Sequence, residues 1–388
     1  MADNQKDNQK NTRRGFLRKT AQGGFAALAL GSFSARADDL SGIPGNKSAV
    51  ARPAIKPDYF IKTVPENMVA GYFGADVPPI ARVKDGAVVE IQTVGAVGIS
   101  KTDPESFFKN NNLPVDAHAL EIIKIQKEVK PEPSGIRGHM LTGPIYIEGA
   151  EPGDMLEVRV LDLSIRSMYG VNMVRPGGGG IPDDITTPNA FIYRYDSRKK
   201  TGTFKEGVEI PLRPFMGVMG VSPPPEKGRV SSIAPGNFGG NLDIRHLTVG
   251  STLYLPVSVP GALFTTGDCH TAQGNGEVSG TAIEGSLTMI AKFIVHKGKT
   301  IKVPRAENAT HFIAIGLDPD LRIAMKNAIR ETCNFISTEI GGFTFNEALS
   351  IASTGVEFEV SQVVDQTLGV HGMIPKSIFT KKKFDYWT

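Results

Sequence analysis

The residues best suited to chemistry lie in one stretch, Thr265–Glu284, which reads TTGDCHTAQGNGEVSGTAIE. It places Asp268, His270, Glu277 and Glu284 among several glycines. Residues two apart on an extended backbone point to the same side, so Asp268 and His270 are expected to face one point. Carboxylate and imidazole groups that converge in this way suit a divalent metal ion. Because glycine is so frequent here, we expect a structured loop rather than a core strand.

Amide hydrolysis is a reaction that such a site would suit. A metal ion with an open position lowers the pKa of bound water and polarises a carbonyl. Glu277 or Glu284 is placed to accept the proton of that water. Two residues from another part of the chain, His139 and Glu148, are candidate partners of the same site.

Three nearby residues allow two interpretations each. Cys269 is a conceivable thiol nucleophile beside His270. Neighbouring residues of a strand face opposite sides, however, so we expect a buried structural thiol. Asn241 and Asp243, in GGNLDIR, are expected either in an exposed turn or near the metal, where they would orient ligands or substrate.

The elements that must position these residues are mainly short strands. The chain has 43 Gly and 26 Pro, which suits many turns. We expect a strand pair within Ala81–Val94, joined by a turn at Asp85-Gly86. The apolar phase slips after Val160, which predicts a β-bulge. The sequence therefore predicts a mainly β (α+β) fold, with a β-sandwich or distorted barrel as its core.

A few helices are expected, mostly toward the C-terminus. Asp103-Pro104 is typical of the start of a short helix. Asp318-Pro319 precedes a segment with helical spacing, and Thr344 with Glu347 forms a capping-box pattern. Cys333 is expected in the core of the first of these late helices.

Overall composition excludes several classes of function. A net charge of +3 over 388 residues gives no electrostatic footprint for nucleic acid. No internal apolar run has the length needed to span a membrane. Two cysteines give no disulfide framework. We therefore expect a small-molecule partner, with no nucleic acid and no membrane contact once any signal is removed.

The first residues are predicted to be an export signal. Thr12–Arg18, TRRGFLR, is typical of a twin-arginine signal, an apolar segment follows over Gly23–Phe33, and Ala35–Ala37 matches an A-x-A cleavage site. Cleavage after Ala37 would leave 388 − 37 = 351 residues. The sequence thus predicts a signal peptide over 1–37, the Tat machinery as a partner and a periplasmic location. Residues 38–388 would form the catalytic unit, either whole or as two closely packed subdomains.

Three segments resemble the acetamidase/formamidase family. They are HMLTGPIYIEGAEPGD (His139–Asp154), the segment Gly236–Glu284 that begins GNFGGNLDIRHL, and SQVVDQTLGVHGMIPKSIF (Ser361–Phe379). The resemblance implies a mostly β amidohydrolase that releases ammonia from short aliphatic amides such as formamide and acetamide. It also implies a homo-oligomer and a bound divalent metal, commonly zinc, with calcium as the second option.

The resemblance also implies roles for individual residues. Asp268 and His270 would be metal-site residues, completed by Glu284 and His139. Glu277 would be the base. Independently of the resemblance, the position of Asp243 in GGNLDIR makes it a second candidate residue of the catalytic site.

Two features depart from the family pattern. Asn275 stands where an aspartate is expected, which puts the charge at the metal in doubt. An export signal is also unusual for an enzyme of small-amide metabolism.

The sequence supports two hypotheses from different classes. The first is a periplasmic, metal-dependent hydrolase of small linear amides. The alternative is a non-catalytic periplasmic binding protein for a small polar ligand, which Asn275 and the export signal motivate. The positions of His246 and His371 relative to the loop do not follow from the sequence.

Overall fold

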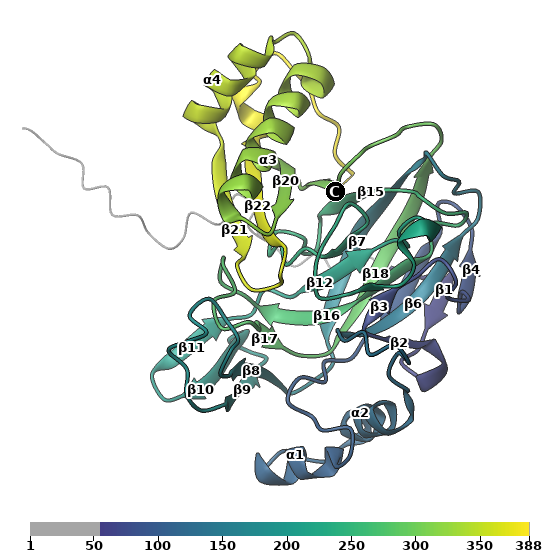
Figure 1. Cartoon of the computed structure of the whole chain (residues 1–388), viewed down its shortest axis with the longest axis vertical. Coiled ribbons are helices and arrows are strands. Elements are labelled where there is room, and N and C mark those ends of the chain that lie inside the picture. The colour runs from purple at the N-terminus through teal and green to yellow at the C-terminus, as the bar shows by residue number, and fades with distance from the viewer. Residues whose placement is uncertain (1–54, 388) are drawn as a thin grey trace, which may run out of the picture. The chain divides into compact units, whose positions relative to one another are not determined.

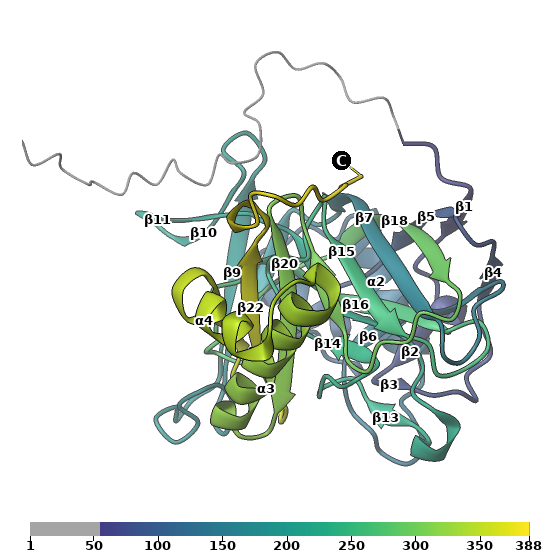
Figure 2. The same cartoon turned by 90° about the horizontal axis from the view of Figure 1, so that it is seen from above.

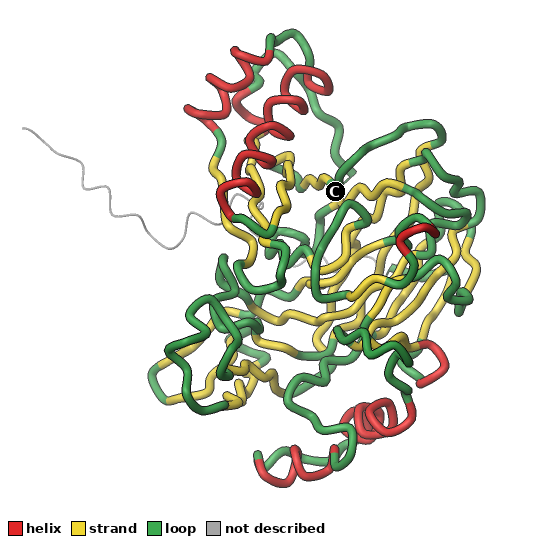
Figure 3. Tube along the Cα trace, viewed as in Figure 1, coloured by secondary structure: helices red, strands yellow, loops and turns green. Residues whose placement is uncertain are grey.

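Strands dominate the part of the chain that the computed structural model describes, which is residues 55–387 (Figures 1 and 3). The predicted twin-arginine signal peptide, residues 1–37, lies outside these residues. No helix among the described residues has the length and apolar character needed to cross a membrane. The predicted mainly β fold with few helices is confirmed.

The first large sheet has nine strands and carries the longest ladders. Its spatial order is β1 (Tyr59–Ile61), β5 (Val88–Gln92), β18 (Leu287–His296), β7 (Met155–Ile165), β15 (Thr252–Pro256), β19 (Arg305–Glu307), β20 (His311–Asp318), β22 (Leu368–Pro375) and β21 (Glu357–Gln362). The register between β7 and β18 shifts between Ile290 and Ala291, opposite Asp162 and Val160. This shift is the predicted bulge, and it reverses which face of β7 is apolar.

The second large sheet has eleven strands and carries the acidic segment. Its main path is β11 (Val208–Pro211), β10 (Thr201–Lys205), β9 (Asn189–Asp196), β8 (Tyr169–Val174), β17 (Ile283–Glu284), β16 (Phe264–Ala272), β12 (Phe215–Gly220) and β14 (Gly239–Asn241). β6 (Met140–Ile147) joins β16 off this path and also pairs with β2 (Met68–Ala70) and β4 (Ala81–Val83). A separate pair, β3 (Tyr72–Phe73) and β13 (Val230–Ser231), forms a small third sheet.

The main hydrophobic core lies between the two large sheets. Val158 of β7 and Phe293 of β18 come from the first sheet, and Phe264 of β16 and Met219 of β12 from the second; all four are buried in one cluster. Neither strand order closes on itself within residues 55–387. The arrangement is therefore the sandwich form of the two predicted cores.

The four α-helices cover two edges of this framework. α1 (Pro104–Asn110) and α2 (Ala117–Glu128) share a cluster with Val171 of β8, and α3 (Leu321–Asn334) and α4 (Phe345–Gly355) pack on β20 and β22 (Figures 1 and 2). Cys333 is buried in the second group, as expected.

The helix starts predicted from the sequence agree in part with those in the structure. The predicted Asp103 cap and the Thr344–Glu347 capping box are both present. The cap of α3 is Asp320, two residues after the predicted one. α2 was not predicted, although Asp116 caps it.

The predicted strand pair within Ala81–Val94 is wrong. β4 and β5 both form, but β4 pairs in parallel with β6, whereas β5 pairs with β1 and β18 of the other sheet. The turn between them does contain Gly86 at φ 82°, and its N–H donates to Phe293. The turn thus carries the chain from one sheet to the other. In its own sheet, β4 pairs with the longer strand β6, and β5 pairs with the longer strand β18.

Candidate active site

Asp268 and His270 lie on a central strand, not in the loop that was predicted. All nine residues of β16 are buried, between β6 and β12. The glycine at 267 serves close packing rather than a turn, because a Cβ there would lie 2.7 Å from Met140 of β6. The predicted convergence is nevertheless confirmed, since His270 Nε2 lies 3.0 Å from Asp268 Oδ2.

Two glutamates approach the same ring nitrogen. Glu284 on β17 is paired in register with His270, and its Oε1 lies 3.3 Å from His270 Nε2. Glu277, in the loop between β16 and β17, places Oε1 3.8 Å from that nitrogen. Ala282 N–H donates to Glu284 Oε1, which fixes this carboxylate. His270 Nε2 thus faces three carboxylates within 3.8 Å.

Gln273 determines which nitrogen of His270 faces the cluster. Its Nε2 donates to the backbone oxygens of Asp243 and Ser361, at 2.9 and 3.2 Å. Its Oε1 must therefore accept from His270 Nδ1, 2.8 Å away. With Nδ1 bonded to Gln273, Nε2 is the nitrogen that faces the carboxylates, where it holds either a proton or, in the neutral ring, a lone pair for a metal ion. The sequence analysis missed Gln273, although its position three residues after His270 was a usable signal.

Asp243 and Asp365 extend the cluster on its other side. Asp243 Oδ1 lies 3.6 Å from His270 Nδ1, and both carboxylate oxygens of this residue are buried without a hydrogen bond. Asp365, in the loop between β21 and β22, forms a group with Asp243 and Glu277 whose oxygens all lie within 4.8 Å of one another. Asp243 was predicted near the site. Asp365 was missed, although it stands in the SQVVDQ segment.

Gly217 of β12 leaves the space in the middle of this cluster. The ladder between β12 and β16 includes Val218 and Met216 but omits Gly217 and Asp268. A Cβ on Gly217 would lie 2.5 Å from Asp243 Oδ1, 2.5 Å from Asp268 Oδ2 and 2.8 Å from the His270 ring. Only glycine therefore allows the two carboxylates to meet beside the imidazole.

Three acidic residues of the cluster have a left-handed backbone. The φ angles are 47° for Asp243, 54° for Asp268 and 45° for Glu277. Only eight non-glycine residues among 55–387 have positive φ, so three of them fall in this one site. Such backbones are unfavourable for residues with a Cβ, and they concentrate where function requires a particular side-chain direction.

The buried cluster holds more carboxyl groups than cations to balance them. Burial raises the pKa of Asp243 and Glu277 well above their usual range, and it also raises the pKa of Glu284. Burial raises the pKa of Asp365 to about 6. A divalent cation among these groups would replace the protons that otherwise neutralise them.

Asp268 and His270 behave differently from the other members. Burial disfavours the charge on His270, but Asp268 and Glu284 outweigh it and hold the His270 pKa well above its ordinary value. Burial also disfavours the charge on Asp268, but His139 and His270 outweigh it and lower its pKa. These two residues therefore form the ion pair of the cluster.

Two cavities flank the cluster. One of about 440 Å³ is lined by His139, Asp268 and Glu284 among others. The second, of about 470 Å³, has Glu277 in its wall and several polar or cationic neighbours: Asn172, Arg213, Arg245, Gln273, Asn275 and Ser279. The acidic cluster thus lies within reach of small molecules from two sides.

His139 lies at the edge of the cluster. Its Nε2 is 3.8 Å from Asp268 Oδ1, and its Nδ1 is 3.1 Å from Ser232 Oγ. It belongs to none of the three-residue groups with metal-ligand spacing among the described residues. The other candidate from the same segment, Glu148, is exposed after β6 and is likewise in none of these groups.

The structure also shows the surroundings of Cys269, Asn241 and Asn275. Cys269 points into the hydrophobic core, its Sγ lies 2.7 Å from Thr93 Oγ1, and burial raises its pKa to about 12. It is the expected structural thiol. Asn241 is buried and donates to Ile233 rather than to the acidic cluster. Asn275 donates to Glu359 Oε2 and does not join the cluster either.

The residues present fit a divalent cation. His270 Nε2 and both oxygens of Asp243 are buried without a hydrogen bond. Gly217 keeps a space open between them. The donors are imidazole and carboxylate groups, which suit Zn²⁺ at His270 and harder ions such as Ca²⁺ among the carboxylates.

Comparison with known families and structures gives a consistent match. The sequence model described as "Acetamidase/Formamidase family" matches residues 65–229 and 226–381. An acetamidase of Mycolicibacterium smegmatis is 25% identical over 283 residues, which cover 56% of this chain and 64% of that protein, less than two thirds of its length. A formamidase of Methylophilus methylotrophus is 25% identical over 372 residues, which cover 75% and 84%.

Solved structures share the fold. The crystal structure of an acetamidase from Bacillus halodurans superposes with a TM-score of 0.67 at 27% identity, over 81% of this chain and 97% of that one. A γ-lactamase from Delftia acidovorans superposes with a TM-score of 0.52 at 22% identity, over 84% and 94%, and shows the fold alone.

Proposed function

Because the chain belongs to the acetamidase/formamidase family, we propose that it hydrolyses the C–N bond of short linear amides such as formamide and acetamide. The products are a carboxylate and ammonia. The observation that carries the proposal is His270 Nε2, buried without a hydrogen bond and facing Asp268, Glu277 and Glu284. The names of the relatives support hydrolysis over the non-catalytic ligand-binding alternative.

A divalent metal, zinc or alternatively calcium, completes the proposed site. Asp268, His270 and Glu284 would hold it. Asp243 lies at metal-ligand spacing from Asp268 and His270, and His139 lies at the edge toward the first cavity. Such an ion, when bound, supplies a Lewis acid that polarises the carbonyl and makes water more acidic.

Glu277 is the proposed base. No side-chain hydrogen bond to Glu277 occurs within the described part of the chain, whereas Glu284 is fixed by Ala282 N–H. Burial raises the pKa of Glu277, which makes its carboxylate a stronger base. It takes a proton from the attacking water and gives one to the departing nitrogen, while the water oxygen bonds to the carbonyl carbon.

The second cavity is the proposed place for the substrate. Glu277 is in its wall, and Asn275 and Ser279 are among the residues that line it. Amide and hydroxyl groups of this kind can bond to both the oxygen and the nitrogen of a small amide.

Ammonia release from formamide and acetamide tests the proposal. We expect activity that is lost with a chelator and restored by added metal. Glu277→Gln should lower kcat by about 100-fold or more, since general base catalysis contributes about 10²–10⁴-fold. Glu148→Gln, an exposed glutamate, is the matched control. Absence of ammonia release with every divalent metal tested would reject the proposal.

Export and assembly are separate proposals. The segment 12–18 supports translocation by the twin-arginine route, with a periplasmic mature protein that begins after Ala37. A homo-oligomer follows from the family resemblance, and light scattering of the purified protein would measure it.

A further inference from the structure

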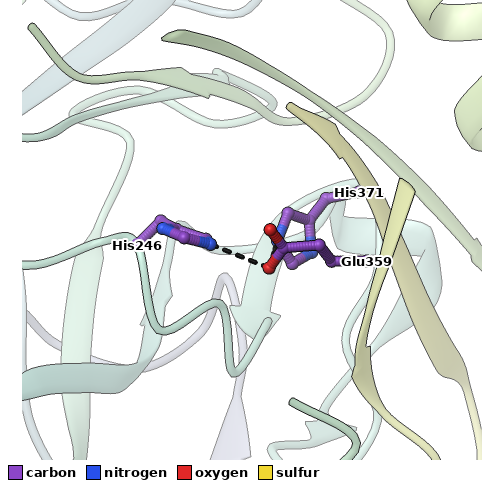
Figure 4. A group of neighbouring side chains, drawn as sticks. All are labelled: His246, Glu359 and His371. Atoms are coloured by element: carbon purple, nitrogen blue, oxygen red, sulfur yellow. Dashed lines mark hydrogen bonds and ion pairs between the residues drawn. The ribbon is translucent and has the colours of Figure 1, made fainter. Parts of the chain in front are cut away.

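A second cluster of metal-binding residue types lies against the loop that carries Asn275. His246 is in the turn after β14, Glu359 is on β21, and His371 lies opposite Glu359 on β22 (Figure 4). His246 Nε2 is 2.9 Å and His371 Nε2 is 3.6 Å from the same oxygen, Glu359 Oε2. One ligand atom from each residue lies within 4.8 Å of the other two.

His371 points an unpartnered nitrogen into this cluster. Its side chain is fully buried, and its Nδ1 lies 2.8 Å from Ser361 Oγ. Its Nε2 makes no hydrogen bond, although it is buried. A histidine with only a structural role normally has both ring nitrogens satisfied. The free nitrogen therefore indicates a ligand among these three residues.

The spacing fits a tetrahedral metal ion. Bonds of about 2.0–2.1 Å from Zn²⁺ to nitrogen or oxygen place neighbouring ligands roughly 3.3 Å apart. The distances of 2.9 and 3.6 Å lie on either side of this value. Glu359 is 27% and His246 17% exposed, so solvent and ions can reach the cluster and supply a fourth ligand.

The donor set selects the kind of ion. Two imidazoles and one carboxylate carry a single negative charge, and Arg213 and Arg245 line the neighbouring cavity. Calcium and magnesium prefer several oxygen ligands, whereas imidazole suits zinc, copper and nickel. The acidic cluster around His270 has the opposite balance, with five carboxyl groups and one imidazole.

We propose that His246, Glu359 and His371 form a second metal site, which binds a divalent transition ion such as Zn²⁺. It is separate from the acidic cluster and does not depend on amide hydrolysis. Ser361 orients His371 by its hydrogen bond to Nδ1, as outer hydrogen bonds do at histidine metal sites.

The site has a structural role toward the loop that carries Glu277. Asn275 donates to Glu359, Gly276 N–H donates to Ser361, and Val363 N–H donates to Gly276. An ion that joins β21 and β22 to the His246 turn therefore fixes the strand to which this loop is attached.

Zinc binding to the metal-depleted full chain tests the proposal. Titration against a competing chelator should show that the wild type binds one zinc ion more than His246→Ala or Glu359→Gln. Ser361→Ala should bind the same number of zinc ions, but about 10–100-fold more weakly at this site. Excess calcium should not displace the zinc held there. The matched control is His296→Ala, which removes a histidine paired with Glu157 alone and should retain the wild-type number.

Equal zinc stoichiometry and affinity in the wild type, His246→Ala and Glu359→Gln would overturn the proposal. Glu359 would then only bridge two histidines. Displacement of this zinc by calcium would equally reject a site selective for transition ions. If His246→Ala does not fold, Glu359→Gln decides the question, because it preserves the size of the side chain.

Discussion

Replacing Gly217 with alanine should prevent the acidic cluster from binding a metal ion, without disturbing the sheet around it. The added Cβ would lie 2.5 Å from one oxygen of Asp243 and one of Asp268, against an ordinary contact of at least 3.4 Å. Each carboxylate would have to withdraw by about 0.9 Å (3.4 − 2.5). Metal–ligand distances tolerate only about 0.2 Å. A misplacement of roughly 1 Å in a catalytic site costs about 10²-fold.

We therefore expect Gly217→Ala to lose its metal and about 100-fold in kcat/KM, which corresponds to about 2.7 kcal/mol of transition-state stabilisation. Metal content by mass spectrometry and ammonia release from formamide measure the two effects. Gly217 has no positive φ, so the backbone itself accepts alanine.

Gly202→Ala on β10 is the matched control. A Cβ there would meet Leu212 and Tyr195 at 3.4 Å, an ordinary contact in the same sheet. It should keep its metal and activity. If Gly217→Ala folds and retains both, then neither carboxylate is needed where the structure places it, and the proposed centre is wrong.

Three further outcomes follow from other parts of the chain. Cys269→Ala should retain full activity, because the thiol points into the core, at a cost of about 1 kcal/mol in stability; loss of turnover in a folded variant would instead support a thiol nucleophile. Replacing Arg13 and Arg14 by lysine should keep the protein in the cytoplasm, as measured by cell fractionation, and continued export would contradict the twin-arginine assignment. Asp154 is buried and accepts hydrogen bonds from Lys297, Gly298 and Glu151; burial raises its pKa, but Lys297 and the two N–H groups outweigh this and lower it. Its charge therefore stabilises the fold above pH ~3.9, and this contribution is lost as the pH falls through the lowered pKa. Asp154→Asn should accordingly lower the unfolding free energy by roughly 1 kcal/mol near neutral pH, with thermal melts that converge with those of the wild type in acid; a gap that persists in acid would argue against this role.

The sequence predicted the convergence of Asp268 and His270 for a reason that holds only in part. Residues two apart do face one point here, but Asp268 has a left-handed backbone and is not extended. The stretch around them was expected to be a loop because it is rich in glycine. In fact Gly267 lets β6 approach β16 closely, and such packing depends on a strand from elsewhere in the chain.

The missed residues depend on contacts that are distant in sequence. Asp365 reaches Asp243 and Glu277 from the loop between β21 and β22, and no local pattern indicates this approach. Gly217 matters only because β12 pairs beside β16. The hairpin prediction at Asp85-Gly86 failed similarly, because local turn chemistry does not reveal which sheet each strand joins.

The structure shows which group the side chain of Asn275 contacts. Asn275 was expected to change the charge at the metal, but its side chain contacts Glu359 instead. An aspartate at this position would repel that carboxylate, whereas the amide donates to it. Asn275 thus belongs with the His246, Glu359 and His371 cluster.

The left-handed backbones of Asp243, Asp268 and Glu277 set a limit on how such a protein can evolve. Each costs about 1–2 kcal/mol relative to a relaxed conformation. Together they lower the free energy of unfolding by roughly 3–6 kcal/mol, a large part of the roughly 5–15 kcal/mol by which domains are stable. A lineage released from selection for activity would gain stability by exchanging any of the three for glycine. Retention of all three acids therefore distinguishes a working member of this fold from one that has kept only its scaffold.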